Sequence, residues 1–431
     1  MNGLCLSHIK IERKCVRRGG IQSLSYWKNS FHHDLVAGVI VAILIIPQAI
    51  AYAILAGVPP VVGLYSATIP VLIYLLFGTS PHLSVGPVAV VSLLIFSGVS
   101  SIAIPGTDDY FSLVITVTFL VGVLQVFFSA LKFGTLLEWI PYSVIKGFTS
   151  ACAVIIAVSQ IENLIGFSLG HSTSVIHTSM TLFTNLESIH LATFFIGLIS
   201  IFLILTINSI SKKLPTPLFV VIILTVSVSF FRLDNFGVPI IGQLPQGFPT
   251  FTLPMFNSEV LMAVFPTAII IAFIGYIESI AVAQVIAEKE NYKLGVNQEL
   301  TSLGLANTIG AFFSSMPVAG GISRSAVNYD SGARTKLASF ITTICIFFTL
   351  LLFTPLFYFL PKPTLAAIII VAITKIINIK GLWLTCKSSK RDCILLLTTL
   401  FMTLLYGPEW GIVCGITLGA LLQLLNSRIS L

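Results

Sequence analysis

The sequence predicts an all-α, polytopic membrane protein, and its composition and apolar segments support this class. Apolar residues make up 56% of the 431 residues, charged residues only 9%, and the mean hydropathy is +1.01. A soluble domain carries about 25% charged residues. Apolar stretches long enough to cross a hydrocarbon core of roughly 30 Å recur along the whole chain. So few charges could not cover a surface in water, and we therefore expect lipid to surround most of this chain.

Charge and cysteine content exclude several partners. The net charge of +7 does not indicate nucleic acid, because the basic residues are spread over many short loops. The seven cysteines are odd in number and lack the spacing of a zinc site or a disulfide framework. Residues 1–30 are polar and basic, without the apolar stretch of a cleaved signal peptide. We predict a cytoplasmic N-terminus here, and no metal or cofactor.

Membrane-crossing segments can be placed by their length and apolar content. The continuous segments are 34–56, 60–77, 111–131, 141–161, 190–208, 215–232, 259–284, 297–313, 335–354, 361–378, 391–406 and 409–427. Two further stretches, 82–103 and 316–332, are apolar but interrupted by Gly, Pro and polar residues. Counting both predicts about 14 transmembrane segments, with 12 or 13 as the alternative counts.

The distribution of lysine and arginine supports this count. If the N-terminus lies inside and every segment crosses, the inner loops hold nearly all basic residues. Only Arg232 and Lys362 fall outside, and Arg324 falls within an interrupted segment. This asymmetry is what the positive-inside rule predicts. We therefore expect a multi-pass protein of the cell inner or plasma membrane, with both termini in the cytoplasm.

Proline and glycine divide the chain into two halves. Residues 233–258 are rich in both and are predicted to form an ordered outer connection. It joins a first unit of seven segments, 31–232, to a second one, 259–431. No extramembranous domain is expected after the last segment.

Each half contains one interrupted passage, the third of its seven. The first reads TSPHLSVGPVAV at 79–90, and the second reads SSMPVAGGISRSAV at 314–327. In each, a short extended stretch leads into residues that can form a half-helix. Non-helical chain at membrane depth must be buried in protein or line a wet cavity. Isolated kinks are the simpler alternative, but paired interruptions at matching positions indicate a transporter binding site.

Two half-helices that begin inside the membrane would form an anion site. Their free N–H groups and the positive ends of their dipoles point at any ligand placed there. Gly86 and Gly321 would let the backbone approach that ligand closely. Pro87 suits a first helical turn. Ser84 and Ser323 could add hydroxyl donors, and Ser323 is a plausible N-cap.

Arg324 and Glu278 are ionisable residues within predicted segments, where charges are costly. Arg324 lies in the first turn of the second half-helix, where the dipole disfavours a cation. An anionic substrate or a carboxylate would compensate, and Glu278 is the natural carboxylate. Glu278 could also accept a proton during transport. A purely structural ion pair would explain the same two residues equally well.

Gln48 and Tyr52 lie in the first segment at i,i+4 spacing and therefore share a helix face. Pro47 frees a backbone carbonyl nearby. An amide N–H and an aromatic ring edge both suit an anion. Hydrogen bonding between helices is the alternative reading of both side chains.

Together these motifs resemble the SulP (sulfate permease) family of anion transporters, in order from about residue 31 to 428. The motifs are PQAIAYA at 47–53, GVPPVVGLYSA at 57–67, FGTS at 77–80, SVGPVAV at 84–90, ESIA at 278–281 and GISRSAVN at 321–328.

The resemblance implies two inverted seven-segment repeats. Segments 1–4 and 8–11 would form a core that carries the substrate, and segments 5–7 and 12–14 a gate that is often the dimer contact. The anion site would lie between the third and tenth segments, with Val88 where some relatives place an aromatic ring. The candidate substrate-binding residues are Gln48, Tyr52, Ser84, Gly86, Pro87, Val88, Gly321, Ile322, Ser323 and Arg324, with Glu278 as the coupling or ion-pair residue.

The expected function is secondary active transport of inorganic anions, sulfate first, with proton coupling through Glu278 and elevator-like movement of the core. Bicarbonate transport and chloride exchange fit the same site. A channel would need a continuous polar pathway, which the apolar gate segments lack. An enzyme would need a nucleophile–base pair or metal ligands, which the sequence does not offer. Most relatives carry a STAS domain after the last helix, and this sequence has none. The expected partners are the anion, the bilayer and a second copy of the chain.

Overall fold

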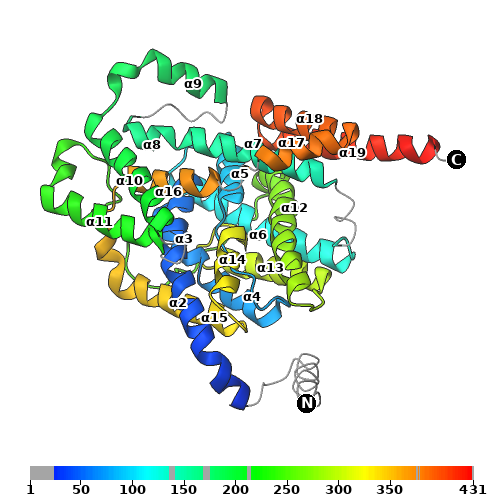
Figure 1. Ribbon diagram of the computed structural model, residues 1–431, viewed down its shortest axis with the longest axis horizontal. Helices are drawn as coiled ribbons and strands as arrows, with labels where there is room; N and C mark the ends of the chain where they lie inside the picture. Colours follow the sequence, from blue (N-terminus) through cyan, green and yellow to red (C-terminus); the bar gives the residue numbers. More distant parts are fainter. Residues whose placement is uncertain are drawn as a thin grey trace, which may run out of the picture.

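The computed structural model describes residues 24–134, 141–167, 175–210, 215–374, 377 and 379–429. Of the predicted cytoplasmic N-terminus, residues 1–30, the first 23 lie outside the described part of the chain, and residues 24–30 belong to the first described helix. The described residues form a helical molecule with one small two-stranded sheet (Figure 1).

The first half of the chain contains ten helices and one strand that matter here. They are α2 (Leu24–Leu55), α3 (Pro60–Ser66), α4 (Ile69–Phe77), β1 (Val85–Gly86), α5 (Ala89–Val99), α6 (Asp108–Ala130), α7 (Tyr142–Ser159), α8 (Ile161–Ile165), α9 (Val175–Thr184), α10 (Leu191–Ile210) and α11 (Thr216–Phe231). Short 3-10 turns follow at Leu186–Ser188 and Leu233–Phe236.

The second half follows the same order of a long helix, a strand and a short helix. Its elements are α12 (Ser258–Lys289), α13 (Val296–Ala311), β2 (Ala319–Gly320), α14 (Ile322–Asp330), α15 (Leu337–Phe348), α16 (Lys362–Thr374), α17 (Ile379–Ser388), α18 (Lys390–Tyr406) and α19 (Pro408–Ile429). A π-helical turn, Thr349–Phe353, and a 3-10 turn, Thr354–Phe357, extend α15.

The all-α membrane class is confirmed. Within the described residues, 8 helices are long and apolar enough to cross a membrane, and Ala89–Val99, Thr216–Phe231 and Pro408–Leu422 are shorter apolar helices. Both predicted interruptions are present as a two-residue strand before a short helix. At about 1.5 Å per residue, neither α5 nor α14 could cross a bilayer alone. The exact number of 14 passages remains a prediction.

The helices pack as two bundles. In the core bundle, α13 packs on α6 and α4, α15 on α2, and α12 on α6 and α5. In the gate bundle, α18 packs on α7 and α19, and α16 packs on α10 and α8. The bundles meet where α2 and α5 contact α7, α11, α16 and α19. In Figure 1 the gate helices α10 and α11 (green) and α18 and α19 (orange to red) lie on either side of the core helices α2 (blue) and α14 (yellow).

The connection at 233–258 is ordered and reaches both bundles. Ile241 donates its N–H to the carbonyl of Leu360 at 3.0 Å, which fixes the loop to the gate side. Thr252 donates to the carbonyl of Phe312 at 2.9 Å, at the end of core helix α13. The loop therefore contacts both bundles. Its predicted role as an outer connection between the two halves of the chain stays a prediction.

Candidate functional site

The two interrupted passages meet as the only sheet in the described residues. Strands β1 and β2 are antiparallel, with Val85 opposite Gly320 and Gly86 opposite Ala319. Gly321 continues the pairing by donating its N–H to the carbonyl of Ser84 at 3.0 Å. Helices α5 and α14 begin directly after these strands, so two helix N-termini lie together in the core bundle.

Both helix starts lack a capping side chain, as do several other described helices, among them α7 and α13. Thr107 caps α6, Asn257 caps α12 and Ser389 caps α18, each by accepting a backbone N–H. By contrast, the N-cap residue of α5 is Val88 and that of α14 is Gly321. At these two described positions, no side chain accepts a hydrogen bond from the helix. Since valine is a poor N-cap, the free N–H groups at these ends are available to a ligand.

The structure corrects two predictions about these ends. Pro87 precedes the N-cap of α5 and is not in the first turn. Ser323 is the second residue of α14, so it cannot be the N-cap. The reason is the sheet: its pairing keeps the chain extended up to Val88 and Gly321, and helical geometry begins only after them.

Arg324 folds back over the two strands. Its side chain is 2% exposed, and its Nη1 donates to the carbonyl of Pro87 at 2.8 Å. A Cβ at Gly321 would lie 2.8 Å from Cζ of Arg324, and one at Gly86 would lie 3.2 Å from Nη2. Both glycines therefore make room for the guanidinium, which the sequence did not indicate. Its Nε and Nη2 have no hydrogen-bond partner among the described residues.

Glu278 lies near this guanidinium on core helix α12. Arg324 lies within electrostatic range of both Glu278 and Tyr52. One carboxylate oxygen, Oε2, is buried and also lacks a hydrogen-bond partner in the described part of the chain. Arg324 and Glu278, which were predicted to be neighbours, thus lie in one region. Each still has buried polar atoms without a hydrogen-bond partner among the described residues. A buried polar atom without a partner costs free energy unless a ligand or water supplies the missing hydrogen bond.

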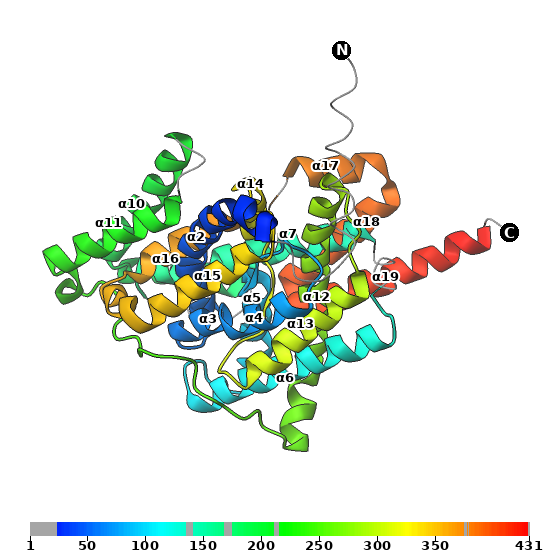
Figure 2. The same ribbon diagram turned by 90° about the horizontal axis from the view of Figure 1, so that it is seen from below.

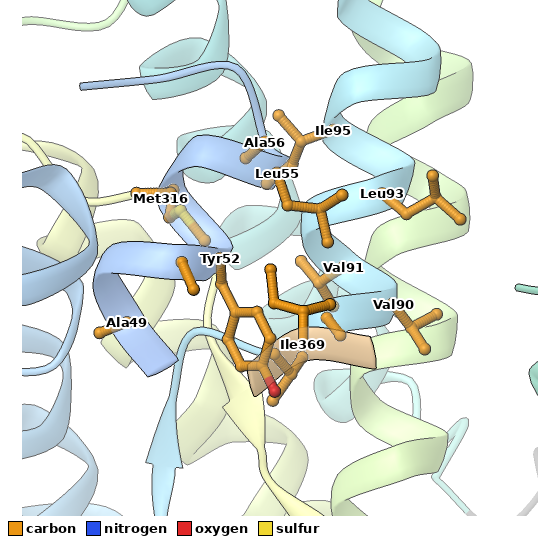
Figure 3. Close-up of a cluster of buried hydrophobic side chains, with 14 of the residues drawn as sticks. Ala49, Tyr52, Leu55, Ala56, Val90, Val91, Leu93, Ile95, Met316 and Ile369 are labelled. Carbon is orange, nitrogen blue, oxygen red and sulfur yellow. The ribbon is translucent and has the colours of Figure 1, made fainter. Parts of the chain in front are cut away.

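Gln48 and Tyr52 lie on α2, 6% and 8% exposed. Figure 3 shows the Tyr52 side chain extending towards Ile369 of gate helix α16, beside the strands. Val88 belongs to the same buried cluster. The first two residues of α14, Ile322 and Ser323, are exposed. The side of the site formed by Ile322 and Ser323 is therefore accessible, whereas the side formed by Tyr52 and Arg324 is buried.

Four polar side chains that the sequence analysis missed hold the strands in place. Asn307 accepts the N–H of Val318 at 2.7 Å and donates to its carbonyl at 3.2 Å. Ser279 accepts the N–H of Gly320 at 2.7 Å. Similar bonds join Ser325 to the N–H of Ser84 at 2.9 Å and Ser66 to the N–H of Met316 at 2.9 Å. The sequence signal that could have identified these four residues is a small polar residue inside an apolar segment.

Comparison with known proteins decides the family. Residues 31–399 match the profile of the sulfate permease family. This chain is a member of that family. The resemblance of its motifs is thereby confirmed over most of the chain.

Two curated relatives show how much of the chain is matched. The chain is 35% identical over 398 residues to the chloroplastic sulfate transporter 4.1 of Arabidopsis thaliana, covering 90% of this chain and 58% of that protein. It is 32% identical over 423 residues to prestin of Danio rerio, covering 90% of this chain and 56% of prestin. The chain thus spans little more than half the length of these relatives.

Solved structures share the fold of this chain. Murine Slc26a9, described as an anion transporter in the inward-facing state, superimposes with a TM-score of 0.87 at 23% identity, over 98% of this chain and 75% of that one. The transmembrane domain of the cyanobacterial bicarbonate transporter BicA gives 0.79 at 25% identity, over 89% of this chain and 97% of that domain.

Proposed function

We propose that this chain carries inorganic anions, sulfate first among them, by secondary active transport. The observation that carries the proposal is the pair of uncapped helix starts at Val88 and Gly321, beside the free Nε and Nη2 of Arg324. Helix N-termini and a guanidinium all favour negative charge. The names of the Arabidopsis sulfate transporter and of BicA support the same class of cargo.

The free edge of Arg324 favours an oxyanion over a halide. Because Nη1 is bound to Pro87, the remaining donors Nε and Nη2 lie side by side on one edge of the planar group. Such an edge can donate two parallel hydrogen bonds to two oxygens of one anion. Sulfate and bicarbonate offer that pair of oxygens, and chloride does not. Bicarbonate is therefore the leading alternative, followed by chloride exchange.

An elevator movement of the core against the gate fits the packing. Within the core, a Cβ at Gly304 would lie 2.8 Å from the carbonyl oxygen of Gly122, so α13 and α6 pack without room to slide. Within the gate, Gly147 lets α7 approach the carbonyl of Leu396 on α18 equally closely. Between the bundles, apolar side chains such as Ile369 face the core. Each bundle can then move as one body, with the anion site on the core.

The same proposal includes the two repeats, the side on which the termini lie and the dimer contact. The two halves, 31–232 and 259–431, would be inverted repeats joined by an outer loop at 233–258. Both termini would lie in the cytoplasm, and the gate bundle would form the contact of a homodimer.

Uptake into proteoliposomes tests the function. We expect labelled sulfate to accumulate, and unlabelled sulfate or bicarbonate to compete, while an uncharged solute of similar size does not. Gradients of pH and of sodium, applied separately, would identify the driving ion. Accumulation of the uncharged solute without either anion would contradict the proposal.

Glu278→Gln tests proton coupling. Glutamine keeps the shape of the side chain but cannot bind a proton, so acidification outside the vesicles should no longer accelerate sulfate uptake. Sulfate–sulfate exchange at equal pH should persist, because the anion site remains. Glu288→Gln, an exposed position on the same helix, should keep the full pH response. If Glu278→Gln keeps it too, the residue is a structural partner of Arg324.

A further inference from the structure

Helix α17 carries an exposed face that mixes apolar and basic side chains. None of its ten described residues is buried. Ile379 is 73% exposed, Trp383 61% and Leu384 57%. Lys380 and Lys387 are exposed on the same half of the helix. Spacings of three and four residues place these five side chains on one surface.

Helix α17 is held to the gate bundle at one end of the molecule. Its opposite side packs on α18 and α7, where Lys146 donates to the Thr385 hydroxyl at 3.1 Å. Figure 2 shows α17 along the upper edge, next to α18. Since it connects α16 to α18, it stays at the membrane. Its two lysines would be costly in hydrocarbon, so the helix must lie along the membrane surface.

The positive charge of this face has no acidic neighbour on the helix. Residues 379–388 contain no Asp or Glu, and the next acidic residue, Asp392, accepts a hydrogen bond from Ser143 at 3.1 Å. Lys387 lies over the ring of Trp383, with Nζ 5.0 Å from its centroid. A tryptophan ring beside a lysine suits the boundary between acyl chains and headgroups.

The exposed lysines at the end of core helix α12 differ in this respect. Lys289 and Lys293, at the end of core helix α12, are interleaved with the exposed acids Glu288 and Glu290. Their net charge is therefore close to zero, whereas the charge on α17 is not neutralised. A negatively charged surface would be drawn to α17 in preference to this end of α12.

We propose that α17 binds the anionic headgroups of phospholipids and so anchors the gate bundle in one leaflet. Trp383, Ile379 and Leu384 enter the acyl boundary, while Lys380 and Lys387 contact lipid phosphates. The anchoring role rests on the elevator mechanism proposed above, because a stationary gate needs a fixed partner. The lipid contact itself does not depend on it.

Fluorescence of Trp383 tests the lipid contact. Trp27, Trp139 and Trp410 are replaced by phenylalanine, and the protein is reconstituted in phosphatidylcholine with brominated phosphatidylglycerol or brominated phosphatidylcholine at equal mole fraction. A lysine near an anionic surface strengthens binding by about fivefold. We therefore expect clearly stronger quenching by the brominated phosphatidylglycerol, by about twofold or more.

Two charge variants complete the test. Lys380→Gln/Lys387→Gln should make the two lipids quench equally, whereas Lys289→Gln/Lys293→Gln, which removes the same charge from the core, should preserve the difference. Equal quenching in the starting protein, absence of quenching by either lipid, or a preference that survives Lys380→Gln/Lys387→Gln would overturn the proposal. Sulfate uptake by the same vesicles is measured separately, so a failure of lipid binding is distinguishable from a failure of transport.

Discussion

Replacing Arg324 with glutamine is expected to lower sulfate uptake by about 100-fold or more. The guanidinium is buried, and its donors Nε and Nη2 have no partner among the residues that the structure describes, next to the uncapped starts of α5 and α14. A hydrogen bond to a charged group contributes about 1.5–3 kcal/mol. Losing two such bonds to the anion accounts for a loss of about 10² to 10⁴. Initial rates of labelled sulfate uptake into proteoliposomes measure it.

Two arginine variants separate charge from geometry. Arg324→Lys keeps the charge without the planar edge, and should recover part of the uptake at a raised KM. Arg334→Gln removes an exposed arginine whose backbone N–H, not its side chain, binds Asp34, and should leave uptake unchanged. Thermal unfolding of Arg324→Gln shows whether it folds. A folded Arg324→Gln variant with uptake like that of Arg334→Gln would refute the role of Arg324.

Replacing Glu299 with leucine is expected to give the largest loss of stability. This carboxylate is fully buried at the start of α13 and accepts the hydroxyl of Tyr74 at 2.7 Å. It also accepts the N–H of Ser80 at 2.9 Å, and the N–H and hydroxyl of Thr79. Each buried donor left unpaired costs about 1–3 kcal/mol. The free energy of unfolding should therefore fall by at least about 3 kcal/mol.

The measurement for Glu299 is thermal unfolding in detergent. Glu299→Gln keeps an acceptor oxygen and should lie between wild type and Glu299→Leu. Glu288→Leu changes an exposed glutamate and should shift stability by less than about 0.5 kcal/mol. Because Thr79 and Ser80 lead into β1, a folded Glu299→Leu variant should also bind sulfate more weakly. An unfolding temperature for Glu299→Leu equal to that of Glu288→Leu would contradict this account.

The features that sequence alone predicted were the local ones. Hydropathy identified the membrane helices, and Pro and Gly identified the two interrupted passages, because both signals depend on neighbouring residues. The choice of Arg324 and Glu278 followed from the cost of charge in lipid. The structure places both near the strands, although neither fills the other's hydrogen bonds.

What sequence missed depends on pairing between distant segments. The N-caps of α5 and α14 were misplaced, because the pairing of β1 with β2 and the bond from Gly321 to Ser84 keep the chain extended longer than local propensity suggests. Asn307 and Glu299 escaped notice because their partners are backbone or hydroxyl groups far away in sequence. Ile369 could not be foreseen beside Tyr52, since it comes from the other bundle.

The central claim is that the anion lies at the starts of α5 and α14, and thiol protection tests it most directly. Ser323, exposed in the first turn of α14, is replaced by cysteine in a variant whose seven native cysteines are serine and which retains uptake. Sulfate should slow modification of this cysteine by a thiol reagent, while sucrose should not. A cysteine at Lys293, exposed in the loop after α12, should be modified at the same rate with and without sulfate. Modification at position 323 that saturating sulfate leaves unchanged, in a protein that still transports, would contradict the claim.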